Sequence, residues 1–166
     1  DGEPKTVLFV HPSCGDPCDQ ARNYLQQRVR NTEVVSINQS DSSEDRYAGF
    51  GVQGVVPFTV IGDKTVRGYS KGGLQSALAQ AYGVEVLSDR GQSVFEHHFN
   101  NSEEPRVVMY ETDQCGYCDR LRQELDAAGV DYTERDIGHN HAARRDFNYL
   151  RGRGTPLTYI GAKRIA

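Results

Sequence analysis

Four cysteines carry the most distinctive chemistry of this chain, and they form two close pairs, Cys14/Cys18 and Cys115/Cys118. Small secreted domains usually scatter their cysteines along the sequence, whereas tight pairs are typical of redox motifs or metal ligands. The thiolate is the form that attacks a disulfide. A helix N-terminus favours that anion through its unpaired N–H groups and its dipole. The pairs therefore indicate thiol–disulfide chemistry wherever a cysteine begins a helix.

The second pair has the spacing that this chemistry needs. Cys115 is expected at the start of a helix, with Cys118 one helical turn further on. From that position Cys118 can attack a mixed disulfide on Cys115 and release a reduced substrate. Gly116 leaves the first sulfur accessible to a partner. A structural pair or half of a zinc site is the alternative interpretation.

The first pair, Cys14-Gly-Asp-Pro-Cys18, contains one more residue. The insertion moves the second sulfur away from the one-turn position, and Asp16 adds a charge that opposes a thiolate. Pro17 can begin the helix, which would leave Cys14 in the preceding loop. A protonated His11 would lower the pKa of the Cys14 thiol, and an ordinary exposed loop histidine is the equal alternative. The first pair is therefore predicted as a redox pair, with a structural disulfide as the main alternative.

An internal repeat gives both pairs the same surroundings. Phe9 and Tyr110 each stand five residues before a cysteine, and Ile37 matches Ile137. Later, Val56-Pro57-Phe-Thr-Val-Ile-Gly matches Thr155-Pro156-Leu-Thr-Tyr-Ile-Gly. Since the matches are colinear, the chain is predicted to contain two copies of one fold.

The hydrophobic pattern of each copy predicts strand, helix, strand, helix, strand, strand, with a closing helix in the first copy. Strands alternating with helices imply a partly parallel sheet. The fold class is therefore α/β, with two tandem domains and a second copy that lacks its last helix in this chain. The expected elements are 6–10, 17–29, 32–37, 43–50, 57–61, 65–67 and 71–82, then 107–110, 116–128, 132–136, 142–150, 157–160 and 164 onward.

The predicted domains are residues 1–83 and 106–166, joined by a linker at 84–105. In the linker, Ser93-Val-Phe-Glu96 has the pattern of a capping box, and Val94, Phe95 and Phe99 give an apolar side. This segment could cover the sheet face that the missing helix leaves open. The alternative is a linker with a single helical turn.

The second copy resembles a glutaredoxin. The resemblance rests on Met-Tyr-x4-Cys-Gly-Tyr-Cys, Tyr-x-Glu-x-Asp-Ile and Gly-Thr-Pro-x-x-x-Ile-Gly, within residues 106–166. Residues 6–82 resemble a diverged member, and together the copies resemble bacterial envelope proteins with glutaredoxin-like domains.

The resemblance implies two thioredoxin folds, each with a mixed four-stranded sheet, and an enzyme that exchanges disulfides. Cys115, Cys118, Cys14 and Cys18 are the expected catalytic residues. The proline that opens each third strand is expected to be cis and to face the cysteines. The expected substrate-binding residues are Tyr117, Thr155, Pro156, Val56 and Pro57.

Disulfide-containing proteins or glutathione are the partners that the resemblance implies, with no tightly bound cofactor and no metal. Glutathione-using members usually have a basic residue three positions before the first cysteine, where this chain has His11 and Thr112. Glutathione is therefore expected only as a possible co-substrate. The alternatives are a protein-binding adaptor with structural cysteines and a glutathione-dependent iron–sulfur cluster protein.

Charge and hydropathy exclude several other classes. A formal net charge of −4 argues against a nucleic-acid binder, and no apolar run is long enough to span a membrane. The pairs His97-His98 and His139-Asn-His141 are expected on the surface. The envelope resemblance predicts a periplasmic or envelope location, with the cytoplasm as the alternative.

Overall fold

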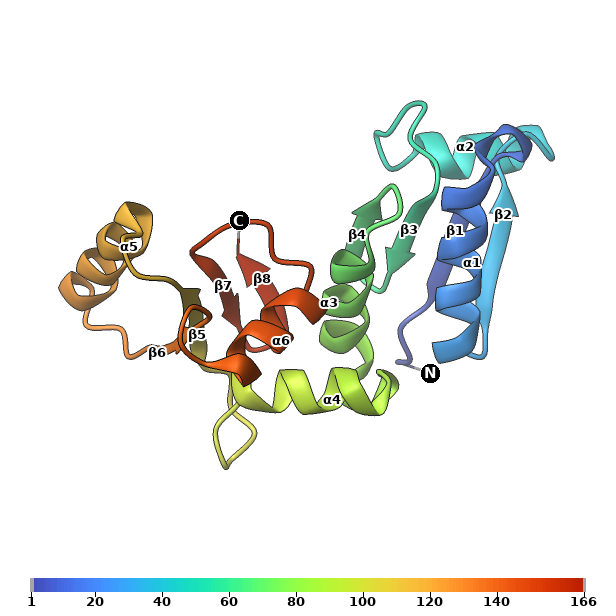
Figure 1. Ribbon diagram of the computed structural model, residues 1–166. Coiled ribbons are helices and arrows are strands. Elements are labelled where there is room, and N and C mark those ends of the chain that lie inside the picture. The colour runs from blue at the N-terminus through green and yellow to red at the C-terminus, as the bar shows by residue number, and fades with distance from the viewer. Residues whose placement is uncertain (1, 166) are drawn as a thin grey trace. The chain divides into compact units, whose positions relative to one another are not determined.

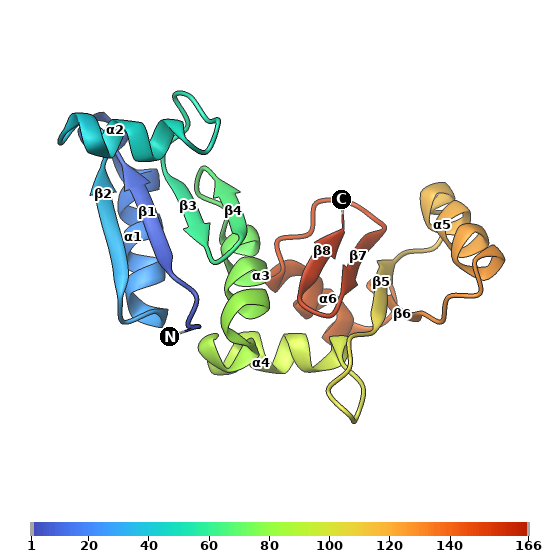
Figure 2. The same ribbon diagram turned by 180° about the vertical axis from the view of Figure 1, so that it is seen from behind.

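The computed structural model describes residues 2–165, which form two compact units divided between Val86 and Leu87. Each unit is built on one four-stranded mixed sheet, with strand orders β2-β1-β3-β4 and β6-β5-β7-β8. Figure 2 shows the strands within each sheet. The two-copy α/β fold with mixed sheets is confirmed.

The first unit follows the predicted order of elements (Figure 1). Strand β1 pairs in parallel with β2 and antiparallel with β3, and β3 continues into the β4 hairpin. Its elements are β1 (Thr6–Val10), η1 (Pro12–Cys14), α1 (Asp16–Arg28), β2 (Thr32–Ser36), α2 (Asp41–Ala48), β3 (Phe58–Ile61), β4 (Lys64–Arg67), α3 (Lys71–Tyr82) and η2 (Val84–Val86).

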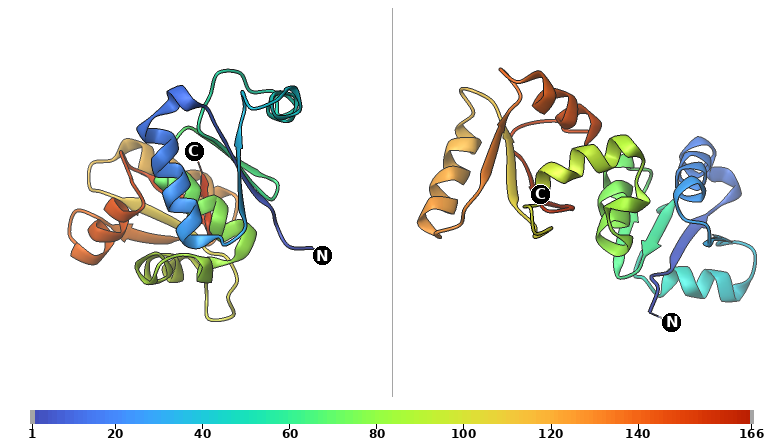
Figure 3. Two further views of the ribbon diagram at one scale, coloured as in Figure 1. Left: turned by 90° about the vertical axis from the view of Figure 1, so that its right-hand side faces the viewer. Right: turned by 90° about the horizontal axis from the view of Figure 1, so that it is seen from below.

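Alternation along β1 sends successive side chains to opposite faces of the sheet. Phe9 joins Tyr47 of α2 and Phe58 of β3 in one core cluster. On the other face, Leu8 is buried on the side of α1, where Leu25 is also fully buried. Figure 3 shows α1 and α2 on opposite faces of this sheet.

The second unit repeats the arrangement with the same pairing pattern. Among the described residues no helix follows β8, so the described part of this unit has no counterpart of α3. Its elements are α4 (Asp89–Phe95), η3 (Glu96–His98), β5 (Val107–Glu111), α5 (Gly116–Ala127), β6 (Thr133–Asp136), α6 (His141–Tyr149), β7 (Leu157–Ile160) and β8 (Lys163–Ile165).

Helix α4 begins earlier than the predicted capping box. Its N-cap is Ser88, whose side chain accepts a hydrogen bond from the N–H of Gly91, and Ser93 lies inside the helix. Val94 and Phe95 are fully buried. The segment is therefore a folded part of the second unit.

This segment does not cover the face that the absent helix leaves open. The Phe95 ring packs edge-on against Tyr159 at 5.8 Å, and Tyr159 shares its sheet face with Tyr110, which contacts Phe147 of α6. Helix α4 therefore packs on the α6 side of the sheet, next to α6. Of the two sequence alternatives, coverage of the open face is therefore wrong, because an apolar stripe shows that a helix packs but not against which face.

Matched residues record the difference between the two units. Val60 of the first unit is half-buried, whereas its match Tyr159 is fully buried under the α4 segment. On the opposite face, Ile61 is fully buried but its match Ile160 is 44% exposed. In the first unit α3 covers the sheet face that α1 packs on. In the second unit α4 covers the sheet face that α6 packs on.

Candidate active sites

The disulfide of the second unit joins Cys115 to Cys118 at the start of α5. Cys115 is the N-cap residue, and its sulfur accepts a hydrogen bond from the backbone N–H of Cys118 at 3.1 Å. Cys115 is half-buried, whereas Cys118 is fully buried. The first sulfur therefore stands where helix N–H groups stabilise a thiolate, as the spacing predicts.

Two threonine hydroxyls extend this hydrogen bonding. Thr155 donates from Oγ1 to the sulfur of Cys115 at 3.4 Å, and Oγ1 of Thr112 lies 3.2 Å from Oγ1 of Thr155. The bond between Thr155 and Pro156 is cis, so this part of the proline hypothesis is confirmed. Thr155 was predicted from the sequence as a substrate-binding residue, but no sequence pattern predicted its contact with Thr112.

Residues 107–165 match the family model described as glutaredoxin. The matched segment lies in the second unit and includes Cys115, Cys118 and the Thr155–Pro156 bond. No curated protein sequence matches the chain.

Two solved structures are similar to the chain. The holo form of glutaredoxin C1 from Populus tremula x tremuloides is 23% identical, with 45% of this chain and 77% of that chain covered and a TM-score of 0.35. The NTD_N/C domain of alkylhydroperoxide reductase AhpF from Enterococcus faecalis (V583) is 14% identical. The match covers 99% of this chain and 84% of the reductase chain, with a TM-score of 0.39.

The cysteine pair of the second unit is open to solvent on one side. Tyr117, between the cysteines, is 71% exposed, and the guanidinium of Arg120 lies 5.7 Å from the centre of its ring. A Cβ added to Gly116 would meet no atom within 4 Å. A partner can therefore approach the pair from the side of Gly116 and Tyr117.

Arg122, one helical turn beyond Cys118 in α5, is surrounded by carboxylates. Arg122 forms ion pairs with Glu111, Asp119 and Glu134. Burial, followed by the nearby charge of Asp136, raises the pKa of Glu111. The helix that carries the cysteines is thus tied to the sheet by one cation that pairs with Glu111 of β5 and Glu134 of β6, while Asp119 belongs to the same helix.

Three further ionisable side chains of the second unit meet, and one of them, Asp113, stands two residues before Cys115. Ligand atoms of Asp113, Asp136 and His139 lie within 4.8 Å of one another. The hydrogen bond from His139 lowers the pKa of Asp136, and the same bond raises the pKa of His139. Since Asp113 and His139 are exposed, ion pairing accounts for this cluster without a metal.

The disulfide of the first unit has a different setting. It joins Cys14, in the short 3-10 helix η1, to the buried Cys18 in the first turn of α1. Helix α1 starts at Asp16, so Cys14 precedes it, as the proline in this motif predicted. Pro57 is cis and opens the strand that pairs with β1, so it lies at the end of β1 from which the chain continues to Cys14.

His11 caps η1. Its Nδ1 accepts a hydrogen bond from the N–H of Ser13 at 3.1 Å. His11 therefore shapes the turn that holds Cys14, a role that neither sequence alternative included.

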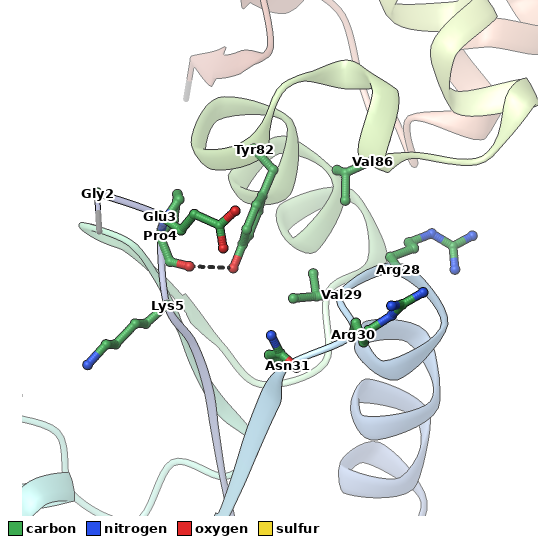
Figure 4. Close-up of a pocket in the computed structure, with 10 residues that line it drawn as sticks. All are labelled: Gly2, Glu3, Pro4, Lys5, Arg28, Val29, Arg30, Asn31, Tyr82 and Val86. Atoms are coloured by element: carbon green, nitrogen blue, oxygen red, sulfur yellow. Dashed lines mark hydrogen bonds between the residues drawn. The ribbon is translucent and has the colours of Figure 1, made fainter.

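Two of the cavities among the described residues of the first unit lie at opposite ends of β1. One, of about 420 Å³, is lined by His11, Ile37, Asn38, Glu44, Tyr47, Ala48, Val52, Gln53 and Gly54, and so adjoins the Cys14 turn. The other, of about 590 Å³, lies where β1 begins and α1 ends, at the opposite end of β1 from Cys14. Figure 4 shows Tyr82 there, donating a hydrogen bond to the carbonyl of Pro4. The second cavity is therefore separate from the disulfide.

The buried His98 contradicts the expectation that both linker histidines lie on the surface. Its Nδ1 lies 2.9 Å from the carbonyl oxygen of Gly161, and its Nε2 lies 2.7 Å from the hydroxyl of Tyr110. A carbonyl only accepts, so Nδ1 carries the proton and Tyr110 donates to Nε2. Burial lowers the pKa of His98 to about 4. His97 is about half-exposed, as expected.

Proposed function

We propose that the chain is a thiol–disulfide oxidoreductase whose principal site is Cys115 and Cys118. The Cys115 thiolate attacks one sulfur of a partner disulfide, and the other partner sulfur leaves as a thiolate that takes up a proton. Cys118 then loses its proton and attacks the sulfur of Cys115, which releases the second partner thiol. Two electrons pass to the partner, and the pair ends as the disulfide.

The observation that carries this proposal is the position of the Cys115 sulfur. It is half-buried at the N-terminus of α5 and receives hydrogen bonds from the N–H of Cys118 and the hydroxyl of Thr155. Donors of this kind stabilise a sulfur that carries negative charge. The match of this part of the chain to the glutaredoxin family supports the same chemistry.

Partner disulfides are proposed to dock against the exposed Tyr117 and the Thr155–Pro156 bond. Reduction of the pair then requires two thiol equivalents, and glutathione is the proposed donor. Thr112 stands where glutathione-using relatives have a basic residue, so a protein disulfide is proposed as the preferred oxidised partner. A periplasmic or envelope location remains a prediction.

Substitution of Cys115 by Ser tests the proposal. Because Cys115 is the proposed nucleophile, the variant should lose most turnover of a peptide disulfide in a glutathione-coupled assay. Cys14→Ser is the matched control, and it should retain the turnover that depends on the second unit. Equal turnover in Cys115→Ser and the unsubstituted protein would refute the assignment.

The competing function is a protein-binding adaptor whose cysteines are structural. The exposed side of the second pair favours exchange over that role, because a purely structural disulfide needs no accessible sulfur. Reduction of each pair in glutathione buffers, followed by mass spectrometry, separates the two. An adaptor would show no exchange at either pair.

A further inference from the structure

We infer that Thr112 is a positioning residue for Cys115 and acts only through the hydroxyl of Thr155. This inference rests on the proposed role of Cys115 as the nucleophile. It adds a residue three positions before the cysteine, in a different strand from Thr155, to the group that controls the thiolate.

The number of hydroxyl hydrogens fixes which group donates each hydrogen bond. Each hydroxyl has one hydrogen, and that of Thr155 is directed to the sulfur of Cys115 at 3.4 Å. The contact of 3.2 Å between the two hydroxyls therefore has Thr112 as its donor. The hydrogen bonds run from Thr112 to Thr155 and from Thr155 to the sulfur.

The topology keeps the two hydroxyls together. Thr112 directly follows β5 and Thr155 precedes β7, and these strands are paired with Tyr110 opposite Leu157. The threonines therefore lie at the same end of neighbouring strands, beside the start of α5. Both are half-buried, so water competes only partly for their hydrogen bonds.

A free hydroxyl rotates and can direct its hydrogen to several acceptors. When Thr155 Oγ1 accepts from Thr112, its own hydrogen is more often directed to the sulfur, and each bond polarises the next. The effect is largest when the sulfur is a thiolate, because hydrogen bonds to charged groups are the stronger ones. Thr112 should thus lower the pKa of the Cys115 thiol.

The first unit lacks this chain of hydroxyls. The matching positions hold His11, whose Nδ1 is bonded to Ser13, and Val56, which has no donor on its side chain. Within one protein, the Cys115 site therefore has two linked threonine hydroxyls and the Cys14 site has none. The difference gives Cys115 a stabilising contact that Cys14 cannot form.

The test measures the thiol pKa of Cys115 in a Cys118→Ser background, from the pH dependence of iodoacetamide alkylation followed by mass spectrometry. A hydrogen bond to a charged group corresponds to a shift of about one pKa unit or more. Thr155→Val should raise the pKa by about one unit. Thr112→Val should raise it by about half a unit, a threefold slower alkylation below the pKa, and Thr112→Ser should restore it.

A double-substitution cycle decides the mechanism. If Thr112 acts through Thr155, then Thr112→Val has no further effect once Thr155 is Val. An equal shift in both backgrounds, or no shift in either, overturns the inference. Thr158→Val in β7 is the matched control, because it makes the same substitution away from the sulfur. Thr112→Ala replaces Thr112→Val if the valine variant does not fold.

The pKa readout does not depend on turnover, so two failures remain distinguishable. A shifted pKa in a protein that exchanges no disulfide would refute the proposed function and leave the role of Thr112 standing. Normal exchange with an unchanged Cys115 pKa in Thr112→Val would refute the role of Thr112 and leave the proposed function standing.

Discussion

Acid should destabilise the second unit through the buried His98. Its imidazole is fully buried, and desolvation lowers its pKa from 6.5 to about 4. The charges of Arg135 and His97 act in the same direction, whereas the Gly161 carbonyl and Asp146 oppose them. In the unfolded chain the imidazole regains its ordinary pKa, so the unfolded state binds more protons between these two values.

The sign and size follow from this difference. A depressed folded pKa contributes stability that is complete above about pH 6.5 and is lost as the pH falls towards about 4. Linkage gives a loss of about 2 kcal/mol between pH 7 and pH 5, and the limit at lower pH is about 3 kcal/mol. Either figure is a large part of the stability of a small domain.

Urea denaturation at pH 7 and at pH 5 measures this loss. Met109 is the only methionine of the chain and is fully buried in the second unit, so its methyl NMR signal follows that unit alone. His98→Gln keeps one donor and one acceptor but does not titrate. This variant should lose about 2 kcal/mol less than the unsubstituted protein between the two pH values. His97→Gln is the control and should keep the full loss.

An equal pH dependence in His98→Gln and the unsubstituted protein would refute the argument. It would mean that the imidazole is solvated or is already protonated in the folded state. Nitrogen NMR shifts of His98 provide a second check, because the bond to Gly161 requires the proton on Nδ1.

Two smaller predictions concern the tightly packed Gly152 and the cap residue His11. Gly152→Ala should destabilise the second unit by about 1–3 kcal/mol in the same urea assay, because its Cβ would lie 2.4 Å from the Phe147 ring; Gly154→Ala, which meets nothing within 4 Å, should cost far less. His11→Ala should remove the cap to Ser13, lower the stability of the first unit by about 1 kcal/mol, and change the alkylation rate of the reduced Cys14. His11→Asn should restore both because Asn also caps, and unchanged values in the alanine variant would contradict the capping role.

Much of the fold could be predicted because the information is local or repeated. Alternating apolar residues located the strands, and the colinear repeat transferred each element from one copy to the other. The cysteines followed directly, since a strand, a loop and a helix fix Cys115 at a helix start. The two prolines matched in the repeat and are both cis.

The rest depends on contacts between residues far apart in the chain. The bond between Thr112 and Thr155 spans 43 positions and is formed by two residue types that are common on surfaces. His98 was expected in solvent because its neighbours in the sequence are mostly polar, but the distant Tyr159 of β7 packs its ring 4.8 Å from the imidazole, centre to centre. Which face α4 covers was equally hidden, because its short apolar stripe fits either side of the sheet.

The two units hold their cysteine-bearing helices in different ways. In α1 the inward positions Ala21 and Leu25 are fully buried, whereas their matches Leu121 and Leu125 in α5 are only half-buried. Apolar area left in water does not contribute to stability, so α5 gains less from packing than α1 does.

In the second unit, ion pairs also hold the cysteine-bearing helix on the sheet. Arg122 is one helical turn beyond Cys118 and binds Glu111 and Glu134 of the two neighbouring strands. The matched positions in the first unit are Val10 and Val34, which cannot form such pairs. Ion pairs near the surface contribute less than apolar burial and weaken with salt. Among the described residues, helix α5 is therefore held on its sheet less by apolar packing and more by ion pairs than α1 is.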